Sequence, residues 1–284
     1  MNIAKSFETT DVHVLGELFR FFHDPLIRFS STDVKVKQDE LINSKKHDYV
    51  LLSFEPRGHR GVNSCLIERS DVADYQLLFI PNKDANVFKL EALAASITYL
   101  VELGRIKPKE KFSIETYKGI FNLSIVYENG KVNRVIYDVK STVIANESNV
   151  HTINGTTYKL IEKPKEVTAL NVEHLGGITE LCMQYVASDY FTGVDYIVLF
   201  EKEEEGDIKT IIIEKDGFII RSPKIEVTIL LSRLLNELVT NKTVYKSYLK
   251  MDDDQSVSVQ GFITSSSMFV YDNEDPLQNG FLLQ

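Results

Sequence analysis

Tryptophan, a disulfide framework and long apolar runs are all missing from this sequence. The 284 residues include no Trp and only two Cys, Cys65 and Cys182, too few for a set of structural disulfides. The apolar runs fall short of the ~20 residues that a membrane-spanning helix needs. The first residues also lack the apolar core of a signal peptide. We therefore expect a cytoplasmic protein of a reducing compartment, with no membrane partner.

Basic residues are also in short supply, since 32 Lys and Arg stand against 41 Asp and Glu. The resulting net charge of -9 argues against nucleic acid as a partner, because phosphates require a basic face. Hydrophobic residues make up 43% and charged residues 26%, which is typical of an ordered globular chain. The length is sufficient for one large domain or for two lobes.

Short segments rich in β-branched, aromatic and aliphatic residues predict strands in both halves of the chain. They cover residues 48–55, 75–81, 121–127, 131–139, 157–161, 195–201 and 209–214. Asn129-Gly130 predicts a hairpin turn, because both residue types tolerate a positive φ.

Apolar residues at helical spacing predict central helices at residues 90–103 and 226–239, and a third helix at 178–187. The two central helices are apolar around much of their circumference, so both should be buried on more than one side. Each half therefore has several strands and one buried helix. This predicts two similar lobes of α+β class, although periodicity alone leaves other α+β arrangements open.

Three segments resemble the proline racemase family in the order in which that family has them. The first runs from Asp11 through His13 and Gly16-Glu17 to Arg20. The second is Glu55-Pro56-Arg57-Gly58-His59, which is identical to the family's segment. The third is the closing region, with Gly261-Phe262-Ile263-Thr264, then residues 272–277 and Gly280-Phe281. This closing region departs from the family at one point, since Asp272-Asn273 stands where the family has its first Asp-Pro.

The resemblance implies the α+β fold shared with diaminopimelate epimerase, with two pseudo-symmetric lobes. Each lobe is expected to be a curved, mostly antiparallel sheet wrapped around a central helix. The N-terminal lobe is expected at 1–115 plus 263–284 and the C-terminal lobe at 116–262. The family's active site lies in the cleft between the lobes and needs no cofactor. One cysteine thiolate at a helix start removes the α-proton of a cyclic amino acid, and the opposite thiol returns a proton.

This chain departs from the family at both helix starts. Counting back from Glu102-Leu103-Gly104 places Lys89 at the first cysteine position, and Arg221-Ser222-Pro223 places Lys224 at the second. Leu90 and Ile225 then stand where the family has glycines, and Glu91 and Glu226 follow them. The Asp that precedes Arg-Ser-Pro in the family is Ile220 in this chain.

One hypothesis is that the cleft is filled and the protein is a pseudoenzyme. Leu90 and Ile225 would block the approach of substrate to the backbone. Lys89 could pair with Glu226, and Lys224 with Glu91, across the lobes. Glutamate at a helix N-terminus is favourable by ~0.3–1 kcal/mol, whereas lysine there needs a partner. Such a protein would bind a small amino-acid-like ligand or a protein partner, and a homodimer stays open.

The alternative hypothesis is that Lys89 and Lys224 replace the thiols as acid and base. A partly buried lysine near a second lysine has its charged form disfavoured, as a base requires. The protein would then be a cofactor-independent amino-acid racemase, epimerase or dehydratase acting on proline-like or hydroxyproline-like substrates. The neighbouring glutamates oppose this, because they favour the charged lysines.

The remaining candidate residues have structural explanations. Cys65 and Cys182 fall in a strand and a helix of core character, so packing is the expected role for both. Arg57 is expected to line the cleft, as are His13 and His59. The two histidines lack a third ligand at metal-like spacing, so no metal site is expected.

Overall fold

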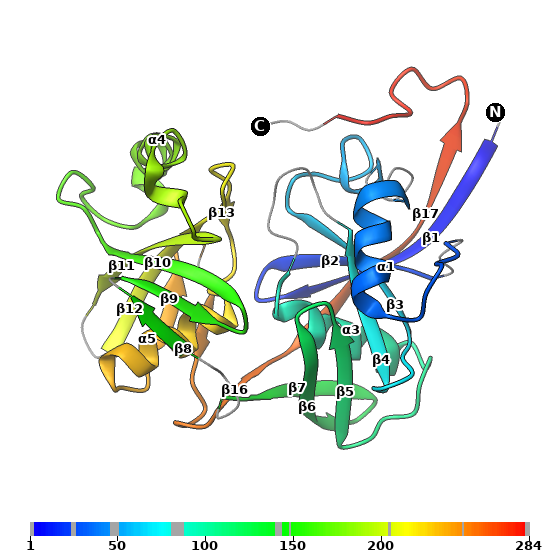
Figure 1. Cartoon of the computed structure of the whole chain (residues 1–284), viewed down its shortest axis with the longest axis horizontal. Coiled ribbons are helices and arrows are strands. Elements are labelled where there is room, and N and C mark those ends of the chain that lie inside the picture. Colours follow the sequence, from blue (N-terminus) through cyan, green and yellow to red (C-terminus); the bar gives the residue numbers. More distant parts are fainter. Residues whose placement is uncertain are drawn as a thin grey trace. The chain divides into compact units, whose positions relative to one another are not determined.

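The computed structural model describes residues 3–23, 27–45, 51–80, 88–139, 144–147, 149–203, 206–245 and 247–281 (Figure 1). The chain divides into two compact units. The first unit comprises Met1–Lys83, Val87–Val135 and Gln260–Gln284, and the second unit includes Ile136–Val259. Each unit has a sheet and a central helix of its own.

A sheet of nine strands lies mainly in the first unit, in the order β16-β7-β6-β5-β4-β3-β2-β1-β17; β16 and the end of β7 fall within residues 136–259, which are grouped with the second unit. The strands are β1 (Ile3–Val14), β2 (Glu17–Phe22), β3 (Val62–Arg69), β4 (Tyr75–Ile80), β5 (Lys111–Thr116), β6 (Gly119–Glu128), β7 (Lys131–Asp138), β16 (Ser256–Val259) and β17 (Gly261–Asp272). The helical elements are α1 (Val34–Glu40), the π-helical turn η1 (Leu41–Lys45), the 3-10 turn η2 (Leu51–Ser53) and the central helix α3 (Glu91–Glu102).

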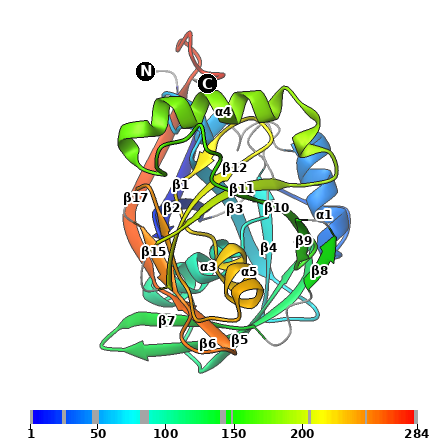
Figure 2. The same cartoon turned by 90° about the vertical axis from the view of Figure 1, so that its left-hand side faces the viewer.

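The sheet of the second unit has eight strands, with β15-β14-β12-β11-β10-β9-β8 in order and β13 paired with β12. The strands are β8 (Ile144–Glu147), β9 (Val150–Ile153), β10 (Thr156–Glu162), β11 (Tyr196–Lys202), β12 (Asp207–Ile213), β13 (Ile219–Ile220), β14 (Thr240–Thr243) and β15 (Tyr248–Lys250). The helical elements are η3 (Val172–His174), α4 (Leu175–Val186), η4 (Asp189–Phe191) and α5 (Ile225–Leu235). Figure 2 shows α4 and α5 on opposite faces of this sheet.

The two units repeat one topology. In the first unit α1 connects the parallel strands β2 and β3, and α3 connects the parallel strands β4 and β5. In the second unit α4 connects the parallel strands β10 and β11, and the segment with β13 and α5 connects the parallel strands β12 and β14. Parallel neighbours need such crossover connections. The predicted pair of α+β lobes with a central helix each is therefore confirmed.

The central helix of the first unit is buried along its whole length. Every residue from Glu91 to Val101 is buried, as the apolar circumference of this segment predicts. The closing strand β17 starts against the helix, because a Cβ at position 261 would lie 2.5 Å from Thr98 Oγ1. Thr264 Oγ1 then donates to the carbonyl oxygen of Asp11 at 3.1 Å. These two contacts explain the spacing of the Gly-x-x-Thr segment.

Two predicted elements differ in the structure. Leu51–Ser53 is a 3-10 turn and not the end of a strand, and residues 48–50 lie outside the described residues. The chain turns tightly here, because Arg57 N and Gly58 N both donate to the carbonyl oxygen of Phe54. The helix expected to reach residue 239 ends at Leu235, because Asn236 adopts a left-handed φ of 54°.

The boundary between the units comes later than the predicted residue 115. Strand β6 pairs with β5 along its length, from Lys111 opposite Ser124 to Thr116 opposite Gly119. Residues as far as Val135 therefore belong to the first unit, which resumes at Gln260 and not at 263. The hairpin at Asn129-Gly130 keeps β7 beside β6, and both turn residues have positive φ as predicted.

Within the described residues, no helix is long and apolar enough to span a membrane. The cytoplasmic location stays a prediction.

Candidate functional sites at two helix starts

A buried lysine precedes the central helix of the first unit. Lys89 is 2% exposed, and the two residues that follow, Leu90 and Glu91, are also buried. The ammonium Nζ of Lys89 donates to Glu17 Oε1 at 2.5 Å, and both side chains are less than 5% exposed. The predicted catalytic position in this unit is therefore an ion pair within the unit itself.

Glu17 is set in place by the turn before it and by a neighbouring strand. Leu15 and Gly16 both have positive φ, so β1 turns sharply into β2 and Glu17 becomes its first residue. Asn63 Nδ2, on the parallel strand β3, donates to Glu17 Oε1 at 3.0 Å and to the carbonyl oxygen of Leu18 at 2.9 Å. The carboxylate thus accepts from two donors on two other segments.

The electrostatic effect of Glu17 on Lys89 opposes basic catalysis. A base must be a neutral amine, whereas an adjacent carboxylate favours the charged ammonium. Sequence analysis placed Glu17 in the opening segment but assigned it no partner. Only the pairing of β2 with β3 brings Asn63 beside it, and no spacing in the sequence signals that contact.

The second helix start, in the second unit, is also buried but differently built. Lys224 is 1% exposed, and Ile225 and Glu226 are fully buried. The Lys224 ammonium lies 4.8 Å from the centroid of the Tyr196 ring, which stacks on Tyr158 at 5.3 Å. A cation over an aromatic face is stabilised by the ring quadrupole.

The backbone of Lys224 has an unusual conformation, with φ 46° and ψ 129°. Side-chain-bearing residues rarely adopt positive φ, and such strain concentrates at functional sites. Three hydrogen bonds made by Asn241 hold this turn. Its Nδ2 donates to the carbonyl oxygen of Pro223 at 2.5 Å and to Thr228 Oγ1 at 3.1 Å, and its Oδ1 accepts from Thr210 Oγ1 at 2.7 Å. Sequence analysis missed both Asn241 and Thr210.

Arg57, which sequence analysis placed in a cleft wall, anchors the C-terminal segment. Its guanidinium pairs with Asp275 at 3.0 Å and lies 4.6 Å from the centroid of the Tyr271 ring. Its own carbonyl oxygen accepts from Arg20, which is bidentate to the Asp11 carboxylate at 2.8 Å. These contacts give the identical five-residue segment a structural role in the first unit.

The two candidate histidines lie in different surroundings. His13 stacks on Phe262 with a centroid distance of 5.2 Å, and burial lowers its pKa. His59 is exposed, and its Nδ1 accepts from the backbone N–H of Gly61 at 3.0 Å. Among the described residues, no three His, Cys, Asp or Glu side chains gather where they could hold a metal ion.

Both cysteines are buried in a strand or a helix, and neither lies in the segment that begins a central helix. Cys65 lies in β3, where burial raises the pKa of its thiol more strongly than the nearby Lys89 ammonium lowers it. Cys182 lies in the middle of α4, and burial raises its pKa to about 12. Both thiols are therefore neutral at ordinary pH, and a neutral thiol is neither a base nor a good nucleophile.

Comparison with known proteins gives full-length sequence matches. No family model matches the chain. It is 24% identical to trans-3-hydroxy-L-proline dehydratase of Bacillus cereus, with all of both chains aligned. It is 20% identical to proline racemase of Acetoanaerobium sticklandii, over 99% of each chain. The chain is therefore similar over its full length to proteins of the proline racemase family.

Two solved structures share the fold. A hydroxyproline epimerase from Agrobacterium vitis, with bound trans-4-hydroxy-L-proline, superposes with a TM-score of 0.80 at 17% identity and covers 100% of this chain. A probable proline racemase from Agrobacterium radiobacter gives a TM-score of 0.76 at 18% identity. The placement of Lys89 and Lys224 at the family's cysteine positions stays a prediction.

Proposed function

We propose that this proline racemase family member has lost the thiol chemistry of the family and is a binding protein. The observation that carries the proposal is the buried pair of Lys89 and Glu17, with its 2.5 Å contact. A lysine held as an ammonium has no lone pair with which to remove a proton. The first helix start therefore offers a neutralised ion pair and no free amine as a base.

The side chains after each lysine support the same proposal. Leu90 and Ile225 are 2% and 0% exposed, so each helix begins with a packed aliphatic side chain. Glycines at such positions let a ligand approach the backbone N–H groups at a helix N-terminus. With a side chain there, a substrate carboxylate loses this approach. Tight binding of the transition state, on which catalysis depends, is then lost too.

The ligand class that we propose is a small amino-acid-like molecule. A structurally similar epimerase holds trans-4-hydroxy-L-proline. Loss of a base removes proton transfer but leaves the binding energy of the remaining contacts in place. The cross-lobe pairs of Lys89 with Glu226 and of Lys224 with Glu91 stay a prediction.

A second candidate function is a lysine-dependent isomerase or dehydratase acting on proline-like substrates. One observation favours it, which is the combination of burial and positive φ at Lys224. A strained backbone that positions a buried amine is expected at a catalytic residue. In that function Lys224 would be the base and Lys89 the acid.

Thermal unfolding with ligand recovery tests the proposed function. The protein is heated with and without millimolar L-proline or trans-4-hydroxy-L-proline, and the ligand is then analysed by chiral chromatography. A ligand that binds only the folded protein raises the midpoint of thermal unfolding by mass action, so we expect a higher Tm with ligand. We also expect the ligand to be recovered unchanged, because no base is available to remove its proton. Conversion of the ligand, lost in Lys224→Ala, would favour the second candidate. An unchanged Tm with both ligands would contradict the proposed ligand class.

A further inference from the structure

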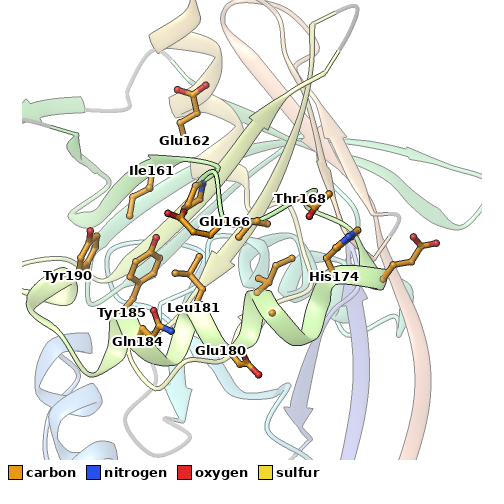
Figure 3. A pocket seen from close by; sticks show the side chains of 15 residues that line it. Ile161, Glu162, Glu166, Thr168, His174, Glu180, Leu181, Gln184, Tyr185 and Tyr190 are labelled. Carbon is orange, nitrogen blue, oxygen red and sulfur yellow. The ribbon is translucent and has the colours of Figure 1, made fainter.

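A half-open groove of about 880 Å³ runs along α4 in the second unit, away from the start of α5 (Figure 3). It is bounded by α4, by the end of β10 and by the segment that follows β10. Its volume lies within the ~300–1,000 Å³ range of ligand pockets. The groove faces the opposite side of the sheet from Lys224, because α4 and α5 cover different faces (Figure 2).

The floor of the groove is apolar. Val167, Ile178 and Tyr185 are buried and belong to the hydrophobic cluster between α4 and the sheet. Ile161 and Leu181 are partly buried and pack against the same cluster. An occupant would therefore bury the exposed parts of Ile161 and Leu181 here, and it would contact polar groups at the edge.

The rim of the groove is acidic. Four glutamates line it, and none of its described lining residues is Lys or Arg; they are Glu162, Glu166, Glu173 and Glu180. The nearby Lys163 is engaged elsewhere, since it pairs with Glu201 at 3.5 Å and donates to the carbonyl oxygen of Val167. The groove therefore complements a positively charged occupant.

Two tyrosines close one end of the groove. Tyr185 and Tyr190 stack with a centroid distance of 4.5 Å, and the Lys159 ammonium lies 4.4 Å from the centroid of Tyr190. Figure 3 shows both phenol rings at the same end. The Tyr190 ring therefore already contacts a cation of this chain, and the two tyrosines form a wall at this end of the groove.

A glycine on the helix opens the groove for close approach. Gly176 and Gly177 lie in the first turn of α4, and a Cβ at either would meet nothing within 4 Å. Packing within the chain therefore does not require glycine at either position, although glycine weakens a helix. Gly177 lines the groove and Gly176 does not. A bare backbone at 177 lets another chain lie against the helix.

We propose that this groove is the docking site for a basic, amphipathic peptide segment of a partner protein. Lysine or arginine side chains of the segment would contact the glutamate rim, and its apolar side chains would cover the partly exposed Ile161 and Leu181. Laying an amphipathic segment in a hydrophobic groove is a recurrent mode of recognition. The proposal is independent of the function proposed for the helix starts.

The test uses a fluorescent twelve-residue peptide with an alternating Lys-Leu-Leu-Lys pattern, titrated with full-length protein and read by anisotropy. The critical pair is Gly177→Leu, which fills the groove, and Gly176→Leu, which adds the same side chain beside it. A second pair of variants compares equal changes of charge at two places. The rim variant has four Glu→Gln substitutions, at 162, 166, 173 and 180. The surface variant has four Glu→Gln substitutions away from the groove, at Glu110, Glu128, Glu237 and Glu274.

We expect at least tenfold weaker binding in Gly177→Leu and in the rim variant, with Gly176→Leu and the surface variant close to wild type. Binding should also weaken as salt rises, because exposed charges are screened. Equal loss in both charge variants would mean attraction to net charge only and would overturn the proposal. The proposal would also be overturned if Gly177→Leu bound the peptide as tightly as wild type, or if wild type did not bind it. A wild-type protein that self-associates, and that Gly177→Leu dissociates, would overturn it too.

Discussion

At the scale of single residues, the buried pair of Lys89 and Glu17 sets what the first helix start can do. Both side chains are nearly inaccessible, and the carboxylate is also held by Asn63. A buried ion pair is not in itself a strong source of stability, but breaking it leaves a buried charge uncompensated. Replacing one member of the pair should therefore lower the free energy of unfolding much more than replacing both members.

Glu17→Gln should lower the free energy of unfolding by about 3–5 kcal/mol, because the Lys89 ammonium loses its counter-charge. The double substitution Glu17→Leu with Lys89→Met should recover most of that loss, since neither member of the pair is then left as an uncompensated charge. Urea denaturation followed by circular dichroism measures both. Lys109→Met is the control, because its exposed pair with Asp74 should contribute less than about 1 kcal/mol. Equal losses in the single and the double variant would contradict this assignment.

The buried thiol of Cys182 predicts a dependence of stability on pH. Burial raises its pKa to about 12 in the folded protein, above the value of about 8.5 for an exposed thiol. The folded state thus disfavours the thiolate, so this contribution is complete below about pH 8.5 and is lost as pH rises toward 12. Unfolding midpoints measured from pH 7 to pH 10.5 should fall less steeply in Cys182→Ala than in wild type. Equal slopes against pH for wild type and Cys182→Ala would rule out a contribution of the Cys182 thiol to the pH dependence of stability.

Much of the residue-scale chemistry could not be predicted from the sequence. The positions of the two lysines beside the helix starts could be predicted, because neighbouring motifs fixed those starts. The surroundings of the lysines could not be predicted, because Asn63 and Asn241 reach the two helix starts only through pairing between strands that are distant in sequence. The role of Arg57 was obscured for the same reason, since its partner Asp275 lies at the other end of the chain.

At the scale of elements, the start of α5 depends on a residue in a conformation that favours glycine. Lys224→Gly should be more stable than Lys224→Ala by about 1 kcal/mol or more, because only glycine adopts positive φ without strain. Thermal unfolding of both variants measures the difference. An alanine variant as stable as the glycine variant would show that the turn relaxes once the lysine is removed.

The close approach of β17 to α3 gives a second prediction at this scale. Gly261→Ala should lower the free energy of unfolding by about 1–3 kcal/mol, because the added Cβ overlaps Thr98 Oγ1. Thr98→Ala should restore much of that loss when combined with it, since the clash is with that side chain alone. A double-mutant cycle by urea denaturation gives the coupling. Additive effects would contradict the contact.

Elements were predicted best where periodicity was long and turn chemistry was local. The central helix at residues 90–103 and the Asn129-Gly130 hairpin are both present. Prediction did worse where tertiary contacts decide the outcome. Residues 51–53 have strand-like composition, yet they form a 3-10 turn that packs against Gly58 and leaves no room for a Cβ there.

At the scale of the whole molecule, one topology is repeated in two units, and each unit begins its central helix with a buried lysine. The fold is shared with a hydroxyproline epimerase, and both thiols of this chain are buried. The fold is retained, whereas we propose that the chemistry is lost.

The most direct test is exchange of the Cα proton in heavy water, followed by proton NMR. L-Proline, D-proline and the hydroxyproline isomers are incubated with the wild-type protein at high protein concentration, because racemisation, epimerisation and α,β-dehydration of such substrates all begin with removal of that proton. The account predicts no exchange above the rate without protein. Exchange that disappears in Lys89→Ala or Lys224→Ala would contradict it and would identify the lysines as the acid and base.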